Sequence, residues 1–105
     1  MSHIPLTPAV FHILLALADG PLHGYAVMQE VESSAGFAMG PGTIYGTLER
    51  LESSGLVKEV GASREGRRRR FALQPAGRTA LQEEARRLSR LASIVRTKRL
   101  LPRES

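Results

Sequence analysis

The spacing of apolar residues changes twice along this chain, and this change restricts the possible folds more than any other feature. Up to Ser54, apolar residues recur at helical intervals of three and four, as Ile44, Leu48 and Leu51 do. Segments 56–60 and 70–73 then have the pattern of two short strands, joined by a Gly- and Arg-rich stretch. The helical interval returns after Pro75. The sequence therefore predicts a mainly α fold with a small β-hairpin.

Local signals predict where the helices begin and end. Thr7 is expected to cap the first helix, with Pro8 at its first position. Gly36 and Gly55 are expected to terminate the second and third helices. The predicted helices span residues 8–18, 22–34, 41–54 and 75–98.

The order helix, helix, helix, hairpin, helix, with a short turn between the second and third helices, indicates a winged helix-turn-helix plus one long C-terminal helix. Alternation in the second strand of the hairpin turns Phe71 and Leu73 towards the core and Arg68 and Arg70 away from it. We expect two units. Residues 1–74 form a winged helix-turn-helix DNA-binding domain, and residues 75–105 form a C-terminal dimerisation helix and basic tail.

Positive charge is concentrated in two parts of the chain. Residues 1–63 hold two basic residues against six acids, whereas residues 64–70 hold five arginines and one glutamate. Residues 71–105 hold eight basic residues and three acids. Like charges packed this densely repel one another, and contact with a polyanion relieves the repulsion. The arginines fall in the wing, where they can contact phosphates while the third helix enters the major groove, so double-stranded DNA is the expected partner.

Several classes of function are not expected. The chain has no cysteine, which excludes disulfides, zinc–thiolate sites and a thiol nucleophile. His3, His12 and His23 lack metal-ligand spacing, and we find no acid pair, phosphate loop or nucleophile–base pattern. We expect no metal, no cofactor and no enzymatic activity. The longest apolar run, 9–18, is too short to cross a membrane and does not follow a basic leader, so a cytoplasmic protein is expected.

Three stretches of the chain resemble the PadR family of bacterial transcriptional regulators. They are LHGYAVMQEV at 22–31, GTIYGTLERLESSGLV at 42–57 and RRRFALQPAGRTAL at 68–81. The chain is similar to the short branch with a single C-terminal dimerisation helix, and the resemblance implies a homodimeric regulator, typically a repressor. Two positions depart from the family pattern. Gly46 stands where proline is usual, and Gln74 stands where threonine is usual.

The candidate DNA contacts come from the third helix, the wing and the HGY stretch. N–H groups and hydroxyls in the first turn of the third helix can bind phosphate, and Arg50 can contact guanine or pair with a nearby glutamate. For Tyr45, Tyr25 and His23, packing inside the domain is the competing interpretation. The residues expected at DNA are Thr43, Tyr45, Gly46, Thr47, Arg50, Arg64, Arg67, Arg68, Arg70, His23 and Tyr25.

The first and last helices carry more apolar residues than one small domain needs to bury. A second copy of the chain is the simplest partner, and a twofold dimer would present two third helices to successive major grooves of an inverted repeat. The resemblance leaves open a small-molecule effector between paired last helices, although that helix has no aromatic residue to stack on it. The expected interface consists of Val10, Phe11, Leu14, Leu81, Leu88, Leu91, Ile94 and Val95.

Two other functions stay open at this stage. A nucleic-acid binder without sequence preference would also use the basic wing, although the chain has only five Phe and Tyr residues to stack on bases, and only Phe71 adjoins the arginines. A winged helix used for protein contacts would instead direct the arginines towards an acidic partner.

Overall fold

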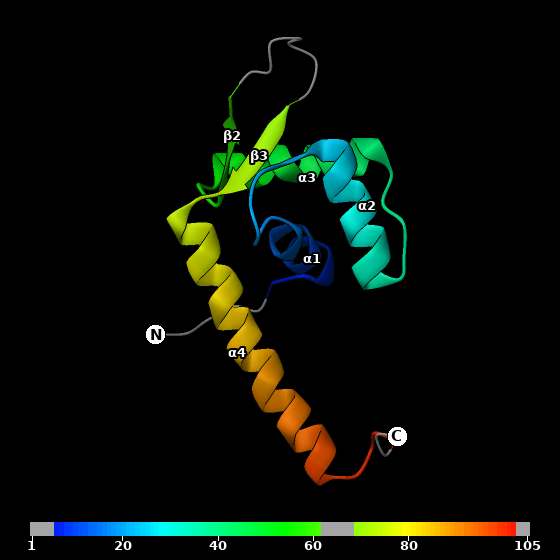
Figure 1. Cartoon of the computed structure of the whole chain (residues 1–105). Coiled ribbons are helices and arrows are strands. Elements are labelled where there is room, and N and C mark those ends of the chain that lie inside the picture. Colours follow the sequence, from blue (N-terminus) through cyan, green and yellow to red (C-terminus); the bar gives the residue numbers. More distant parts are fainter. Residues whose placement is uncertain (1–5, 62–68, 103–105) are drawn as a thin grey trace.

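A computed structural model describes residues 6–61 and 69–102 of the chain (Figure 1). Both strand pairs of its sheet are antiparallel, in the order β1-β3-β2. The predicted fold class, mainly α with a small β-hairpin, is confirmed. In the described residues the elements are α1 (Pro8–Ala16), β1 (Leu22–His23), α2 (Gly24–Ala35), α3 (Pro41–Ser53), β2 (Val57–Val60), β3 (Arg70–Leu73) and α4 (Pro75–Thr97).

The beginning of the second helix differs from the prediction. Leu22 and His23 form the short strand β1, and α2 begins only at Gly24. Leu22 lies opposite Phe71 and His23 lies opposite Arg70 in β3. The two residues are extended because they pair with a strand far along the chain, and no local pattern signals such a pairing.

The structure shows the capping residues that the sequence predicted at three helix ends. The Thr7 hydroxyl accepts a hydrogen bond from the Val10 N–H at 3.2 Å, which satisfies a donor that the first turn of α1 cannot pair internally. Gly36 and Gly55 follow α2 and α3 with φ of 77° and 80°, a left-handed conformation that favours glycine. These caps confirm how the second and third helices stop.

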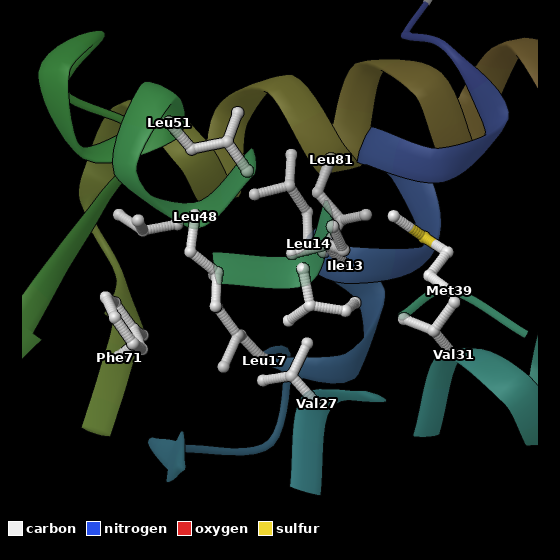
Figure 2. Packing of buried hydrophobic residues seen from close by; sticks show 12 residues of the cluster. Ile13, Leu14, Leu17, Val27, Val31, Met39, Leu48, Leu51, Phe71 and Leu81 are labelled. Carbon is white, nitrogen blue, oxygen red and sulfur yellow. The ribbon is translucent and has the colours of Figure 1, made fainter. Parts of the chain in front are cut away.

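The core lies around α1, which is packed between α2 and α4 (Figure 1). Figure 2 shows side chains from all four helices and from β3 meeting there. Burying a large aliphatic or aromatic side chain contributes about 1.5–3 kcal/mol each, so this cluster is the main source of stability. Its fully buried members include Ile13, Leu14, Leu17, Val27, Val31, Ile44, Leu48, Val57 and Phe71.

Helix α4 is held tightly at its beginning. The Gln74 N–H donates to the Leu56 carbonyl at 2.9 Å, and a Cβ at Gly77 would collide with that same carbonyl oxygen. Leu81 and Glu84 are the last buried residues of the helix. We call residues 75–87 the proximal part of α4 and residues 88–97 its distal part. The distal part extends away from the rest of the protein (Figure 1).

Candidate nucleic-acid interface

Helix α3 lies directly beside the β2–β3 hairpin (Figure 1). Ile44, Leu48 and Leu51 bury one side of the helix in the core, which turns its other side outward. Thr43 is exposed in the first turn, and Arg50 is exposed near the end. The exposed side of α3 and the base of the wing thus belong to one side of the molecule.

Tyr45 packs within its own domain. Its ring lies so close to Gly24 that a Cβ there would collide with it, and its centroid is 6.4 Å from that of Phe71 in an edge-on arrangement. The side chain therefore joins the start of α2, helix α3 and strand β3. Tyr45 is half-buried, so packing inside the domain covers much of the ring and leaves part of its surface open to solvent.

Thr47 does not lie on the surface, and its prediction as a DNA contact is corrected. The residue is 4% exposed and belongs to the buried side of α3. It lies three positions after Ile44 and four before Leu51, which is the interval of the helix face that faces the core. Its hydroxyl accepts a hydrogen bond from Arg50 Nη2 at 3.4 Å. Gly46, one position earlier, is half-buried with open space beside its Cα.

The wing arginines fall into three groups. Arg64, Arg67 and Arg68 lie outside the described residues. Arg70 lies in β3, opposite both Val60 of β2 and His23 of β1, and is half-buried. Arg69, which was not among the predicted contacts, reaches Glu49 of α3 and Glu59 of β2 with both distances at 3.2 Å. The hydrogen bond with Glu59 raises the pKa of Arg69 above its ordinary value. Burial opposes this effect, and the hydrogen bond with Glu49 adds to it.

The two residues of the HGY stretch differ in exposure. Tyr25 is 61% exposed in the first turn of α2. His23 is half-buried in β1 and immediately precedes α2. Pairing of His23 with Arg70 brings the start of α2 to the edge of the wing strand. Tyr25 is thus available to a partner, whereas His23 lies at the junction where β1 of the sheet continues into α2.

The predicted dimer residues divide between the core and the surface. Leu14 is fully buried and Leu81 is 6% exposed, so their assignment to the interface is corrected: both pack inside the protomer. Helices α1 and α4 pack against one another. This contact inside the protomer buries some of the apolar side chains that were predicted from the sequence to contact a second copy of the chain. Val10, Phe11 and Val95 are half-buried, and Leu88, Leu91 and Ile94 are exposed.

A groove of about 420 Å³ lies where α1 meets α4. At its α4 side the buried Glu84 carboxylate accepts from Arg87 Nε at 3.0 Å and from Arg87 Nη2 at 2.6 Å. This pairing raises the pKa of Arg87, chiefly through the hydrogen bonds that Arg87 donates to Glu84. The groove therefore combines apolar walls with one charged pair. Its lining consists of Leu6, Pro8, Phe11, His12, Glu84, Arg87 and Leu88.

In the part of the chain that the structure describes, no group of three or more His, Asp or Glu side chains could hold a metal ion. Every helix within residues 6–61 and 69–102 is too short or too polar to cross a membrane.

The family model and one of the relatives that this chain matches are described as transcriptional regulators. Residues 13–83 match the family described as "Transcriptional regulator PadR-like family". Transcriptional regulator Rv3488 of Mycobacterium tuberculosis is 45% identical over 85 residues, which cover 80% of this chain and 78% of that protein. An uncharacterized 37.1 kDa protein in transposon TN4556 of Streptomyces fradiae is 48% identical over 83 residues. Those residues cover 79% of this chain but only 24% of that protein, so the chain spans about a quarter of its length.

Solved structures show the same fold. A PadR family transcription regulator from Clostridium difficile R20291 superposes with a TM-score of 0.74 at 23% identity, covering 87% of this chain and 97% of that one. BpsR of Bordetella bronchiseptica, whose DNA binding is regulated by 6-hydroxynicotinic acid, superposes with a TM-score of 0.71 at 26% identity, covering 86% and 67%. Because the family match spans more than half of the chain and Rv3488 is similar over most of both proteins, this chain belongs to the PadR-like family and is a DNA-binding transcriptional regulator, not an enzyme.

Proposed function

We propose that the protein is a homodimeric repressor that recognises an inverted-repeat operator in double-stranded DNA. The observation that carries this proposal is the position of α3 beside the hairpin, because a helix and a wing on one side can contact a major groove and its flanking phosphates together. In this proposal residues 1–74 bind DNA, and residues 75–105 form the dimer helix and basic tail. The protein then acts in the cytoplasm, where its DNA target lies.

The proposed contacts divide into those that position the protein and those that read the sequence. Thr43 is exposed in the first turn of α3, where backbone N–H groups favour a phosphate. Arg50 is exposed on the outer side of the same helix and is the candidate for guanine. Tyr45 and Gly46 border this surface, Tyr25 and His23 flank it, and Arg64, Arg67, Arg68 and Arg70 supply the wing's phosphate contacts.

The proposed dimer forms through the distal part of α4. Leu88, Leu91 and Ile94 recur at intervals of three and are exposed, with half of the Ile94 side chain open to solvent. Apolar side chains that cluster on one side of a helix are typical of a buried interface between subunits. Val10, Phe11 and Val95, which are half-buried, complete the proposed contact surface.

Regulation by a small effector is the part of the proposal that rests on the α1–α4 groove. Its volume of about 420 Å³ falls within the range of about 300–1,000 Å³ typical of small-molecule sites. A compound with an apolar body and one polar end fits the mixture of Phe11, Leu88 and the Glu84–Arg87 pair. Because Leu88 also belongs to the proposed interface, such a compound would act on the dimer. BpsR, a structural neighbour with ligand-regulated DNA binding, supports this mode of control.

Selection of bound fragments from random duplex DNA tests the proposal. We expect enrichment of an inverted repeat with half-site centres about one helical turn, roughly 10–10.5 bp, apart. Binding to DNA without any enriched sequence would instead support the non-specific nucleic-acid binder. Failure to bind DNA would leave the protein-interaction module as the candidate function.

A matched pair of substitutions ties the selected sequence to α3. Replacing Arg50 by Ala should weaken binding to the enriched operator by about 1–3 kcal/mol and relax the preference at one base pair of each half-site. Replacing Arg86, which is exposed on the proximal part of α4, by Ala should leave the preference unchanged. An unaltered preference in both variants would remove Arg50 from the reading surface.

A further inference from the structure

Of the two arginines of the run that the structure describes, Arg69 and Arg70, Arg69 is the one that contacts α3. Its Nη1 lies 3.2 Å from Glu49 Oε2 on α3, and its Nη2 lies 3.2 Å from Glu59 Oε1 on β2. The residue thus joins the helix at the proposed DNA surface to the first strand of the wing. We call Arg69, Glu49 and Glu59 the Arg69 clamp.

Strand alternation explains why Arg69 turns inward while its neighbour does not. Residues two apart on a strand share a face, so Arg69 lies on the face of Phe71, which is fully buried. Glu59 is directly opposite Phe71 in β2, on the same face. Arg70 belongs to the other face of the strand, opposite His23. One arginine of the run therefore faces α3, and the next faces away from it.

The Arg69 guanidinium also contacts two aromatic rings, those of Tyr45 and Phe71. Its Cζ lies 5.2 Å from the centroid of the Phe71 ring and 6.0 Å from that of Tyr45. A guanidinium within about 6 Å of a ring is attracted to the ring face. Tyr45 belongs to α3 and Phe71 to β3, so these ring contacts bridge the same two parts of the molecule as the ion pairs do.

The clamp changes which charges the proposed surface presents. Glu49 and Glu59 are partly exposed, and without a cation beside them they would repel the phosphates of bound DNA. Arg69 pairs with both carboxylates and offsets one of their two negative charges, so its own charge is not available in the same way to a phosphate. Ion pairs this exposed contribute little to stability, so the effect of the clamp is expected in geometry and not in folding.

We propose that Arg69 is a positioning residue for sequence-specific binding: it fixes the base of the wing against α3 and shields the Glu49 and Glu59 carboxylates from DNA. This inference rests on the proposed operator-binding function. It predicts that loss of Arg69 damages discrimination between DNA sequences, whereas loss of a phosphate-binding arginine weakens binding to every sequence equally.

Matched substitutions at two neighbouring arginines test the proposal. Arg69→Met keeps the apolar stem beside the rings and removes the charge, and Arg70→Met makes the same change on the opposite face of the strand. Affinity for the selected operator and for a scrambled duplex is measured with the full chain at several salt concentrations. We expect Arg69→Met to lower the ratio of the two affinities about tenfold. Arg70→Met should weaken both duplexes alike and reduce the slope by about one unit.

A further variant separates shielding from positioning. Adding Glu49→Gln to Arg69→Met removes a carboxylate that has lost its cation. We expect this double variant to bind both duplexes more tightly than Arg69→Met while the affinity ratio stays low. If Arg69→Met reduces the salt slope and weakens both duplexes alike, Arg69 is a phosphate contact and the proposal is overturned. An affinity ratio equal to that of the wild type would overturn it as well.

A measurement without DNA distinguishes failure of the clamp from failure of the proposed function. In ¹⁵N-edited spectra of the free protein, Glu49→Gln and Glu59→Gln should each shift the Arg69 guanidinium signal, whereas both should leave the Arg70 signal in place. An unmoved Arg69 signal would overturn the clamp, whatever the protein binds. If the wild type selects no sequence although Arg69 responds to both substitutions, the operator-binding function fails and so does the role of the clamp in specificity.

Discussion

The proximal and distal parts of α4 belong to one continuous helix, yet their surroundings are opposite. In the proximal part Gly77, Leu81 and Glu84 are buried against the rest of the protein. In the distal part Leu88, at its start, and Ile94 are exposed. Apolar residues recur at the same helical interval in both parts. The interval alone therefore indicates that the apolar face of the helix is buried against something. It does not indicate whether the same chain or a second chain buries it.

What separates the two parts is where the other helices stop. Helix α1 is only nine residues long and packs against the proximal part of α4. Nothing in the described part of the chain reaches the outer side of the distal part, where Leu91 and Ile94 are exposed. The proximal part thus serves the protomer, and the distal part is available for the proposed partner copy. Two pairs of substitutions test this division, and a third pair tests how the beginning of α4 is attached.

The largest effect is expected at the start of the distal part. Leu88→Glu introduces a carboxylate into an apolar contact on both subunits of the proposed dimer, and should raise the dissociation constant by about a thousandfold, or about 4 kcal/mol. Leu15→Glu is the control, because Leu15 is an equally exposed leucine on α1 outside the predicted interface. Analytical ultracentrifugation should find Leu88→Glu monomeric and Leu15→Glu unchanged. A dimeric Leu88→Glu would refute the assigned surface.

A smaller effect is expected in the proximal part. Leu81→Ala removes a buried side chain from the core and should lower the free energy of unfolding by about 3 kcal/mol. Leu91→Ala, the same change on the distal part, should alter it by less than about 0.5 kcal/mol when both are made in the monomeric Leu88→Glu background. Urea unfolding measures both values. Equal losses at the two positions would abolish the distinction between the two parts.

The smallest effect concerns glycines in α4 and α3. Gly77→Ala should lower stability by about 1–3 kcal/mol, because the new methyl group meets the Leu56 carbonyl oxygen. Gly46→Ala should raise stability by about 1 kcal/mol, because its Cβ enters open space within a helix. Thermal unfolding checks the opposite signs. A stable Gly77→Ala variant would show that the start of α4 can move away from Leu56.

Most of the fold could be predicted because its signals are local. The interval of Ile44, Leu48 and Leu51, the Thr7 cap and the left-handed glycines each specify an element within a few residues. Strand β1 could not be predicted, since its two residues are extended only through pairing with β3. A local sequence pattern does not indicate pairing with a strand that lies far along the chain.

The candidate site was less predictable, for two physical reasons. Thr47 was placed at DNA as a residue at the margin of the core stripe of α3. Its interval from Ile44 and Leu51 is that of a core residue, and a small hydroxyl can be buried when Arg50 bonds to it. Alternation already separates Arg68 and Arg70 from Phe71, and by the same rule Arg69 falls on the face of Phe71. The pattern does not indicate that Glu49 of α3 and Glu59 of β2 meet Arg69 on that face.

The bond from Gln74 to Leu56, together with the burial of Leu81 and Glu84, sets the angle of α4 relative to the wing. With 23 residues at about 1.5 Å per residue, the helix is roughly 34 Å long. A tilt of about 5° moves its far end by about 3 Å, close to the spacing of about 3.4 Å between successive bases of one strand. In a dimer joined at the far ends, the same tilt would move the two wings instead. The angle of α4 would then determine which operator spacing the protein can span.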